Sequence, residues 1–67
     1  MKPKEFSSKK AALEAVDECQ RTGWRAGIMG SGPWYVQAIH TGNGLRIVYD
    51  LHEDGMMREY SRKEVAA

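Results

Sequence analysis

The chain is poor in the devices that often decide what a small protein does. One of its 67 residues is cysteine, so no internal disulfide can form. Ten basic and nine acidic residues nearly cancel, so net charge gives no reason to bind nucleic acid or an acidic membrane. No apolar run approaches the roughly 20 residues of a membrane span. A lone thiol and the lack of such a run predict a cytoplasmic protein that does not bind membranes.

What remains is the composition of one small globular domain. Hydrophobic residues make up 42% of the chain and charged residues 28%, which is not the balance of a disordered tail. A chain of this length buries only about 60% of the surface that it exposes when unfolded. We therefore expect residues 1–67 to form one domain of modest stability, with residues 1–6 as a loosely ordered basic lead-in.

The first third of the chain predicts an amphipathic helix. Ala12, Val16 and Cys19 recur at three- and four-residue spacing and form an apolar stripe. Ser7 is a suitable N-cap, and Gly23 supplies the left-handed residue that follows many helices. The stripe should face the core, where Cys19 acts as a small apolar side chain and not as a reactive thiol.

After the helix the apolar period changes to two residues, and turn signals interrupt it about every ten residues. The strand candidates between these turns are Trp24–Met29, Trp34–Thr41, Leu45–His52 and Met56–Tyr60. The sequence thus predicts a single two-layer α+β domain, with an N-terminal helix on a four-stranded antiparallel β-meander (αββββ). Residues 61–64 match a capping box, which allows a short C-terminal helical turn.

Alternation along these strands predicts how they pair. A turn at Gly42-Asn43 gives the apolar pairs Trp34–Leu51, Val36–Tyr49 and Ala38–Ile47. The preceding hairpin gives Ile28–Trp34, Ala26–Val36 and Trp24–Ala38. A three-residue turn with Gly55 in the left-handed region gives Leu51–Met57. All these side chains share one face, which the helix stripe should cover.

The same pairing predicts an opposite face that is rich in tyrosine, arginine and aliphatic residues. Its neighbours are expected to be Ile39–Arg46, Gln37–Val48, Val48–Tyr60 and Asp50–Arg58. Tyrosine and arginine often anchor protein interfaces because they bury much area and keep a polar tip. We interpret this face as a contact surface for a protein partner or a second copy, although ordinary surface exposure also leaves some apolar atoms in water. The candidate contact residues are Arg25, Tyr35, Gln37, Ile39, Arg46, Val48, Arg58 and Tyr60.

No set of residues suggests catalysis, a metal site or a cofactor. His40 is expected on the helix side of the sheet and His52 on the opposite side, so they should not share a ligand or a proton. The glycine-rich stretch at residues 27–32 lacks the lysine and the following helix of a phosphate loop. These observations favour a protein that is not an enzyme.

One stretch is similar in layout to a known family. A helix ending in Gly23-Trp24, followed by a strand and the turn Gly30-Ser31-Gly32, resembles the HicA-type toxins. Those are small double-stranded-RNA-binding-like domains that cut mRNA with a histidine placed after Gly-Ser. The resemblance covers a small part of the chain, and Gly32 stands where the histidine would be. It implies RNA binding without nuclease activity.

The leading hypothesis is a non-enzymatic binding protein that docks its sheet face or a sheet edge on a protein partner. In size it resembles the accessory proteins of phages and mobile elements, which often inhibit a larger host machine by occupying its surface. Self-association as a homodimer would also cover the exposed residues. The alternative is a nucleic-acid-binding module that stacks bases on tyrosine and neutralises phosphates with arginine from the same face.

Overall fold

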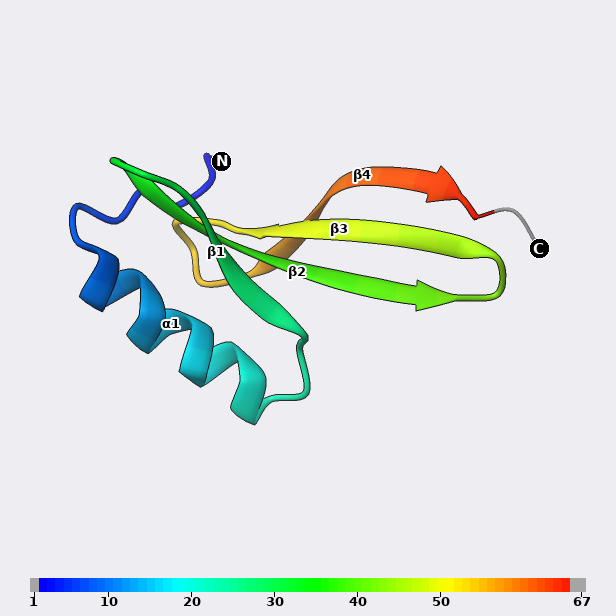
Figure 1. Ribbon diagram of the computed structural model, residues 1–67, viewed down its shortest axis with the longest axis horizontal. Helices are drawn as coiled ribbons and strands as arrows, with labels where there is room; N and C mark the ends of the chain where they lie inside the picture. The colour runs from blue at the N-terminus through cyan, green and yellow to red at the C-terminus, as the bar shows by residue number, and fades with distance from the viewer. Residues whose placement is uncertain (1, 66–67) are drawn as a thin grey trace.

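The computed structural model describes residues 2–65, which form one helix on a four-stranded antiparallel sheet (Figure 1). In chain order the elements are α1 (Lys9–Arg21), β1 (Ala26–Gly30), β2 (Trp34–Gly42), β3 (Leu45–Leu51) and β4 (Met57–Glu64). The strands lie in the order β1-β2-β3-β4, which confirms the predicted αββββ meander. In the part of the chain described, no helix is long and apolar enough to cross a membrane.

Helix α1 begins one residue later than predicted. Ser8, and not Ser7, is the N-cap, and its Oγ accepts a hydrogen bond of 3.1 Å from the Ala11 N–H. The predicted stripe is buried as expected, with Ala12, Val16 and Cys19 all facing the sheet. Burial, followed by the charge of the neighbouring Glu18, raises the pKa of the Cys19 thiol.

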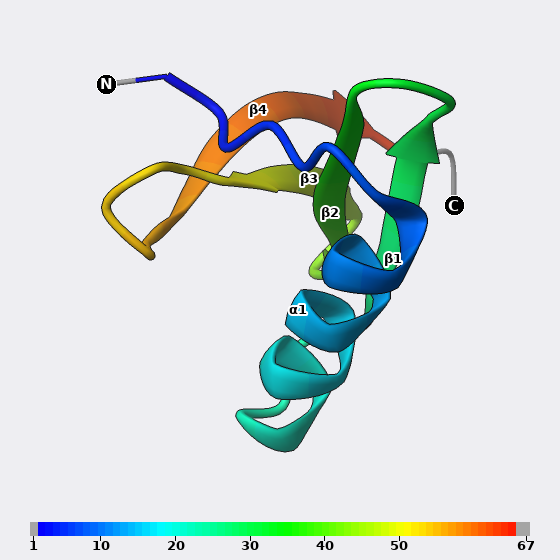
Figure 2. The ribbon, with the colours of Figure 1, turned by 90° about the vertical axis from the view of Figure 1, so that its left-hand side faces the viewer.

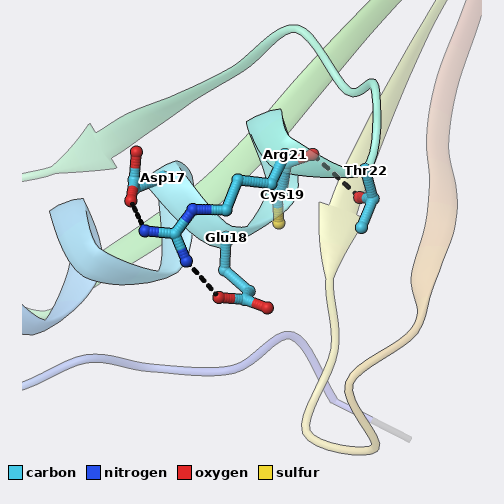
Figure 3. A network of polar contacts seen from close by, with 5 residues as sticks. All are labelled: Asp17, Glu18, Cys19, Arg21 and Thr22. Atoms are coloured by element: carbon cyan, nitrogen blue, oxygen red, sulfur yellow. Dashed lines mark hydrogen bonds and ion pairs between the residues drawn. The ribbon is translucent and has the colours of Figure 1, made fainter.

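The helix ends as the glycine signal predicts. Gly23 has a φ of +96°, its N–H donates to the Gln20 carbonyl, and the Trp24 N–H donates to the Cys19 carbonyl. These two bonds define a Schellman motif. The Thr22 hydroxyl also donates to the Cys19 carbonyl, at 2.8 Å (Figure 3). The last turn is therefore fixed in a position that directs the chain back into β1.

The hydrophobic core lies between α1 and the first two strands. Helix α1 lies against β1 and β2, and the β3–β4 hairpin extends to one side of it (Figure 2). The buried members of the core are Phe6, Ala12, Val16, Cys19 and Val36. Trp24 packs edge-on against Tyr49 with ring centroids 5.0 Å apart, which extends the core to β3.

The pairing of β2 with β3 is two residues away from the prediction. Asn43 and Gly44, with φ of 53° and 75°, form the turn, so Gly42 pairs with Leu45 and Ala38 with Tyr49. The predicted turn at Gly42-Asn43 is wrong because Asn-Gly is the combination that adopts a two-residue turn with both φ values positive. A shift of two residues leaves every side chain on its predicted face.

The first hairpin shows the same two-residue shift. Ala26 pairs with Ala38 and Ile28 with Val36, so the predicted partners Val36 and Trp34 are wrong. The chain needs three residues to reverse, because Gly30 pairs with Trp34 and residues 31–33 form the loop. Again the helix-facing residues remain on the helix side.

The last hairpin begins as predicted and then departs from the prediction. Leu51 pairs with Met57, and Gly55 has a φ of +83° in the three-residue turn. Beyond this start the register shifts, so that Val48 lies opposite Ser61, and Tyr60 is the extra residue of a β-bulge. The predicted Val48–Tyr60 pair is therefore wrong.

Strand β4 also replaces the helical turn that the capping-box pattern allowed. Ser61 to Glu64 pair with Val48 to Leu45, so the strand runs four residues past the predicted end at Tyr60. A helix cannot form where these backbone groups take part in the ladder with β3. The predicted helical turn is wrong because long-range strand pairing prevails over a short local signal.

The N-terminal segment joins the ends of two strands. The Phe6 N–H donates to the Trp34 carbonyl at 2.8 Å, and the Trp34 N–H donates back at 2.9 Å. Two residues earlier, the Lys4 N–H donates to the Leu51 carbonyl at 2.9 Å. The sequence predicts a loosely ordered lead-in here, whereas the structure places residues 2–6 between the splayed ends of β2 and β3. Phe6, which is 8% exposed, anchors the segment in the core.

Candidate functional site

The candidate site is the face of the sheet opposite α1, called the outer face below. Its members follow from the strand registers and from the alternation of side chains across a sheet. They are Arg25, Gly27, Met29, Tyr35, Gln37, Ile39, Thr41, Arg46, Val48, Asp50, Arg58, Ser61 and Lys63. Seven of the eight predicted contact residues belong to this set, and Tyr60 lies in the bulge beside it.

The middle of the outer face is apolar. Ile39 pairs directly with Val48, and its side chain is 48% exposed. The Ile39 N–H donates to the Arg25 carbonyl at 3.1 Å, so Arg25 flanks this pair from the β1 side. A shallow hollow over β1 and β2 is lined in part by Arg25, Gly27 and Ile39. This row therefore offers an exposed aliphatic pair next to a cation.

A second row is occupied by an internal hydrogen bond. The Gln37 side chain donates from Nε2 to Asp50 Oδ1 at 2.8 Å, and Asp50 is only 5% exposed. The predicted Gln37–Val48 neighbours are therefore wrong. The predicted Asp50–Arg58 pairing is correct in register, but the Arg58 guanidinium forms its ion pair with Asp54 in the turn. Gln37 thus satisfies a buried carboxylate, which makes it a structural member of the face.

The turn ion pair has a clear electrostatic signature. The hydrogen bond from Arg58 lowers the pKa of Asp54, and the Met56 N–H, 3.0 Å from Asp54 Oδ1, lowers it further. An arginine held in this way is less available to a partner than Arg25 or Arg46. Among residues 2–65, neither Arg25 nor Arg46 takes part in an ion pair.

Tyr35 lies at the end of the face near the N-terminal segment. Its hydroxyl donates to Glu5 Oε1 at 3.2 Å. Partial burial, then the hydrogen bond and charge of Glu5, raise the pKa of Tyr35. The bond to Glu5 connects Tyr35 to the N-terminal segment. Along β2, Gln37 lies between Tyr35 and the Ile39–Val48 pair.

The opposite end of the face is cationic, and the sequence reasoning missed one of its members. Arg46 pairs with Thr41 on one side and Lys63 on the other, so the predicted Ile39–Arg46 pair is wrong. Lys63 reaches the outer face because the bulge at Tyr60 changes the alternation of β4. No sequence signal marks that bulge, and residues 61–64 instead resemble a helix start. Tyr60 itself is 67% exposed.

The two histidines lie apart, as predicted. His40 pairs with Ile47 within the β2–β3 ladder, and His52 lies at the other end of β3 beside Pro3. Within the described residues there is no group of three or more His, Cys, Asp or Glu side chains that could hold a metal ion. The outer face therefore has an aliphatic centre and a cationic end.

The charges at the end of α1 lie away from this face. Arg21 forms ion pairs with Asp17 at 2.5 Å and with Glu18 at 3.1 Å (Figure 3). These acids lie four and three residues earlier in the helix. All three side chains are more than half exposed. Pairs of this kind contribute little to stability in water. Together Asp17, Glu18 and Arg21 leave one net negative charge at the end of the helix.

Comparisons with known proteins add no identity. No protein-family model matches the chain, and no curated protein or solved structure is significantly similar to it. The proposed function therefore rests on the chemistry of the outer face.

Proposed function

We propose that this protein is a non-enzymatic binding protein that docks the outer face of its sheet on a protein partner. One observation carries the proposal: the paired side chains of Ile39 and Val48 lie on a sheet face that α1 leaves uncovered, with Arg25 beside them. An aliphatic centre with a polar rim is the usual anatomy of a protein interface.

The charges of the rim indicate the chemistry of the partner. Arg25 lies at one side of the aliphatic pair, and Arg46 with Lys63 lies at the cationic end of the face. Asp50 is 5% exposed and accepts a hydrogen bond from Gln37, so it is not presented to a partner. The complementary surface is an apolar patch with carboxylates at its edge, which would speed encounter and fix the orientation of the partner.

The role that fits such a chain is to occupy the surface of a larger protein. A small domain of this kind can inhibit or adapt a host machine simply by covering the surface that the machine needs. Many phage accessory proteins act in this way. The single cysteine, Cys19, is buried and reduced, which is consistent with a cytoplasmic protein. Inhibition by docking is therefore the activity that we propose to test.

The test is affinity capture with matched variants from a lysate of the source cells. The variant Ile39→Asp/Arg46→Glu changes the centre and the cationic end of the face. The control Met56→Asp alters an equally exposed apolar residue, 59% exposed, on the β3–β4 turn. The proposal predicts a stoichiometric protein captured by wild type and control and lost with the double variant. Capture that is equal for all three folded chains would contradict the site.

Nucleic acid is the second candidate, and the adjacency of Arg46 and Lys63 favours it. Two neighbouring cations can neutralise phosphates, and Tyr35 could stack on a base at the other end of the face. Nuclease treatment of the captured material separates the two candidates. Loss of the captured material on nuclease treatment, with affinity that falls log-linearly with salt, would replace protein docking by nucleic-acid binding.

A further inference from the structure

The two edges of the described sheet differ in how they are protected from pairing with another chain. Strand β4 carries a bulge at Tyr60 and a run of charged side chains, both of which discourage edge-to-edge pairing. Strand β1, with the sequence AGIMG, has no charged residue, no proline and no bulge. It pairs only with β2, and Met29 on it is 53% exposed. Such a strand is a ready template for another strand.

The backbone of β1 presents its free groups at the centre of this edge. Because the Ile39 N–H bonds the Arg25 carbonyl, antiparallel alternation turns the N–H and C=O of Ala26 and Ile28 towards the open edge. The Ala26 carbonyl receives a hydrogen bond of 3.3 Å from Gln20 Nε2 of α1. The backbone groups of Ile28 lie at the middle of the strand.

The flank of α1 beside this edge exposes one large apolar side chain, Leu13. Gln20 reaches Ala26, which identifies the flank of the helix that lies nearest to the edge. Leu13 lies on the same flank, since seven residues advance a helix by nearly two full turns. Its side chain is 46% exposed. It is bordered by Lys9, Lys10, Glu14 and Asp17.

We propose that two copies of this chain pair through β1, antiparallel about a two-fold axis at Ile28, to form one eight-stranded sheet. The strand is complementary to itself in this arrangement. Met29 of each copy lies opposite Gly27 of the other, and the space above Gly27 is open. Ala26 lies opposite Gly30, and the backbone groups of the two Ile28 residues bond each other. A self-complementary patch of this kind gives a closed dimer.

The helices fit the same two-fold arrangement. Helix α1 packs on both β1 and β2, and adjacent strands lie about 4.8 Å apart. Pairing β1 with its copy therefore brings the two helix axes to about 10 Å, an ordinary distance for packed helices. The exposed Leu13 side chains then meet between the helices.

The charges along the helix flank are compatible with this arrangement. The two helices of the dimer run in opposite directions, so Lys10 at the start of one lies beside the end of the other, which carries Asp17 in its ion pair with Arg21. Lys10 of each copy can therefore add a second cation to the Asp17 carboxylate of the other copy. The two-fold arrangement fills the open space at Gly27 with Met29 twice, and for this reason a second copy is the occupant that we infer.

The interface consists of one five-residue strand and one helix flank, so it is smaller than the roughly 1,600 Å² of a standard complex. We expect dissociation in the micromolar range. The inference uses β1 and the flank of α1, whereas the proposed function uses the outer face. Either can fail without the other, and a dimer would join two outer faces into one continuous surface.

Sedimentation equilibrium of three chains tests the inference. Wild type should change from monomer to dimer as its concentration rises from about 1 µM to about 1 mM, a range that spans the expected affinity. Leu13→Glu and Leu13→Lys each place like charges near the axis and should weaken association at least about tenfold. An equimolar mixture of the two variants should dimerise again, because the charges then attract. Met56→Glu is the control and should behave as wild type.

Amide hydrogen exchange in wild type locates the interface independently of any variant. The Ile28 N–H should exchange at least about tenfold more slowly in the dimer than in the monomer, because it gains a partner only there. The Met29 N–H, which points towards β2, should be far less sensitive to concentration. A chain that is monomeric throughout, a mixture that stays monomeric, or a dimer whose Ile28 exchange does not change would each overturn the inference.

Discussion

The part of the sheet that α1 covers and the part that extends beyond it are held together in different ways (Figure 1). In the covered part, Val36 and Ala38 have no solvent exposure, and residues 2–6 add backbone bonds between β2 and β3. In the extended part, the end of β2, the turn at Asn43-Gly44 and the end of β4 are exposed, and most residues of β3 are only half-buried. Packing stabilises the first part, whereas the backbone ladder stabilises the second.

This difference separates the residues that stabilise the fold from those of the proposed contact surface. The aliphatic pair Ile39–Val48 and the cations Arg46 and Lys63 lie where the sheet leaves the helix. Residues in this part can change with little effect on the core, because few buried contacts depend on them. The small hydrophobic core thus lies at one end of the domain, and the candidate contact surface lies towards the other end.

The largest expected effect is a loss of core packing in the covered part. Val36→Ala removes two methyl groups from a side chain with no exposure and should lower the free energy of unfolding by about 2–3 kcal/mol. Val48→Ala, the same change on the half-buried outer face, should cost less than about 1 kcal/mol. Urea unfolding followed by the fluorescence of Trp24 and Trp34 measures both values. Equal losses would show that the two parts are packed alike.

The next effect concerns the buried carboxylate at the border of the two parts. Gln37→Ala removes the donor of the 2.8 Å hydrogen bond to Asp50 and should cost about 1–2 kcal/mol of unfolding free energy. The double variant Gln37→Ala/Asp50→Ala should lose much less unfolding free energy than the sum of the two single variants, because it no longer buries a carboxylate without its donor. Gln20→Ala, which removes an exposed 3.3 Å bond, is the control and should cost less than about 0.5 kcal/mol. Additive losses for Gln37 and Asp50 would contradict this account.

The sequence predicts the covered part well, since its signals agree with one another. The stripe of α1, Gly23 at its end and the three-residue turn at Gly55 each fix a face or a direction, and the structure confirms all three. The register errors of the β1–β2 and β2–β3 pairs are both shifts by two residues, and such shifts leave the alternation of side chains intact. The choice of faces is therefore robust even where the partners are wrong.

The extended part is less predictable because pairing there depends on contacts between distant residues. The bulge at Tyr60 and the strand at Ser61–Glu64 arise from the ladder with β3, while the local pattern favours a helix start. As a result, the sequence does not place Lys63 on the outer face, and it pairs Tyr60 with Val48 although Tyr60 is the unpaired residue of the bulge. The outer face was predicted as a set of residue types, but its rows follow only from the observed registers.

A glycine substitution in the distal turn should act locally. Gly44 has a φ of +75°, so Gly44→Ala strains the turn by about 1 kcal/mol. If the extended part opens independently of the core, amides near Leu45 should exchange about five times faster, while the Val36 amide stays unchanged. Gly55→Ala, at a φ of +83° in the turn beside the core, should instead speed exchange at Val36 as well. Uniform acceleration by Gly44→Ala would mean that the two parts unfold together.

The smallest effect is the pH dependence of the turn that joins β3 to β4. Arg58 and the Met56 N–H lower the pKa of Asp54 below that of the unfolded chain, so the pair stabilises the fold above the ordinary aspartate range. That contribution should disappear as the pH falls through this range to the lower folded-state pKa. In Arg58→Gln, NMR titration should find the pKa of Asp54 raised, and the stability difference from wild type should vanish in acid. Arg21→Gln, at the end of α1, is the matched control, and an Asp54 titration that responds equally to both variants would argue against a local ion pair.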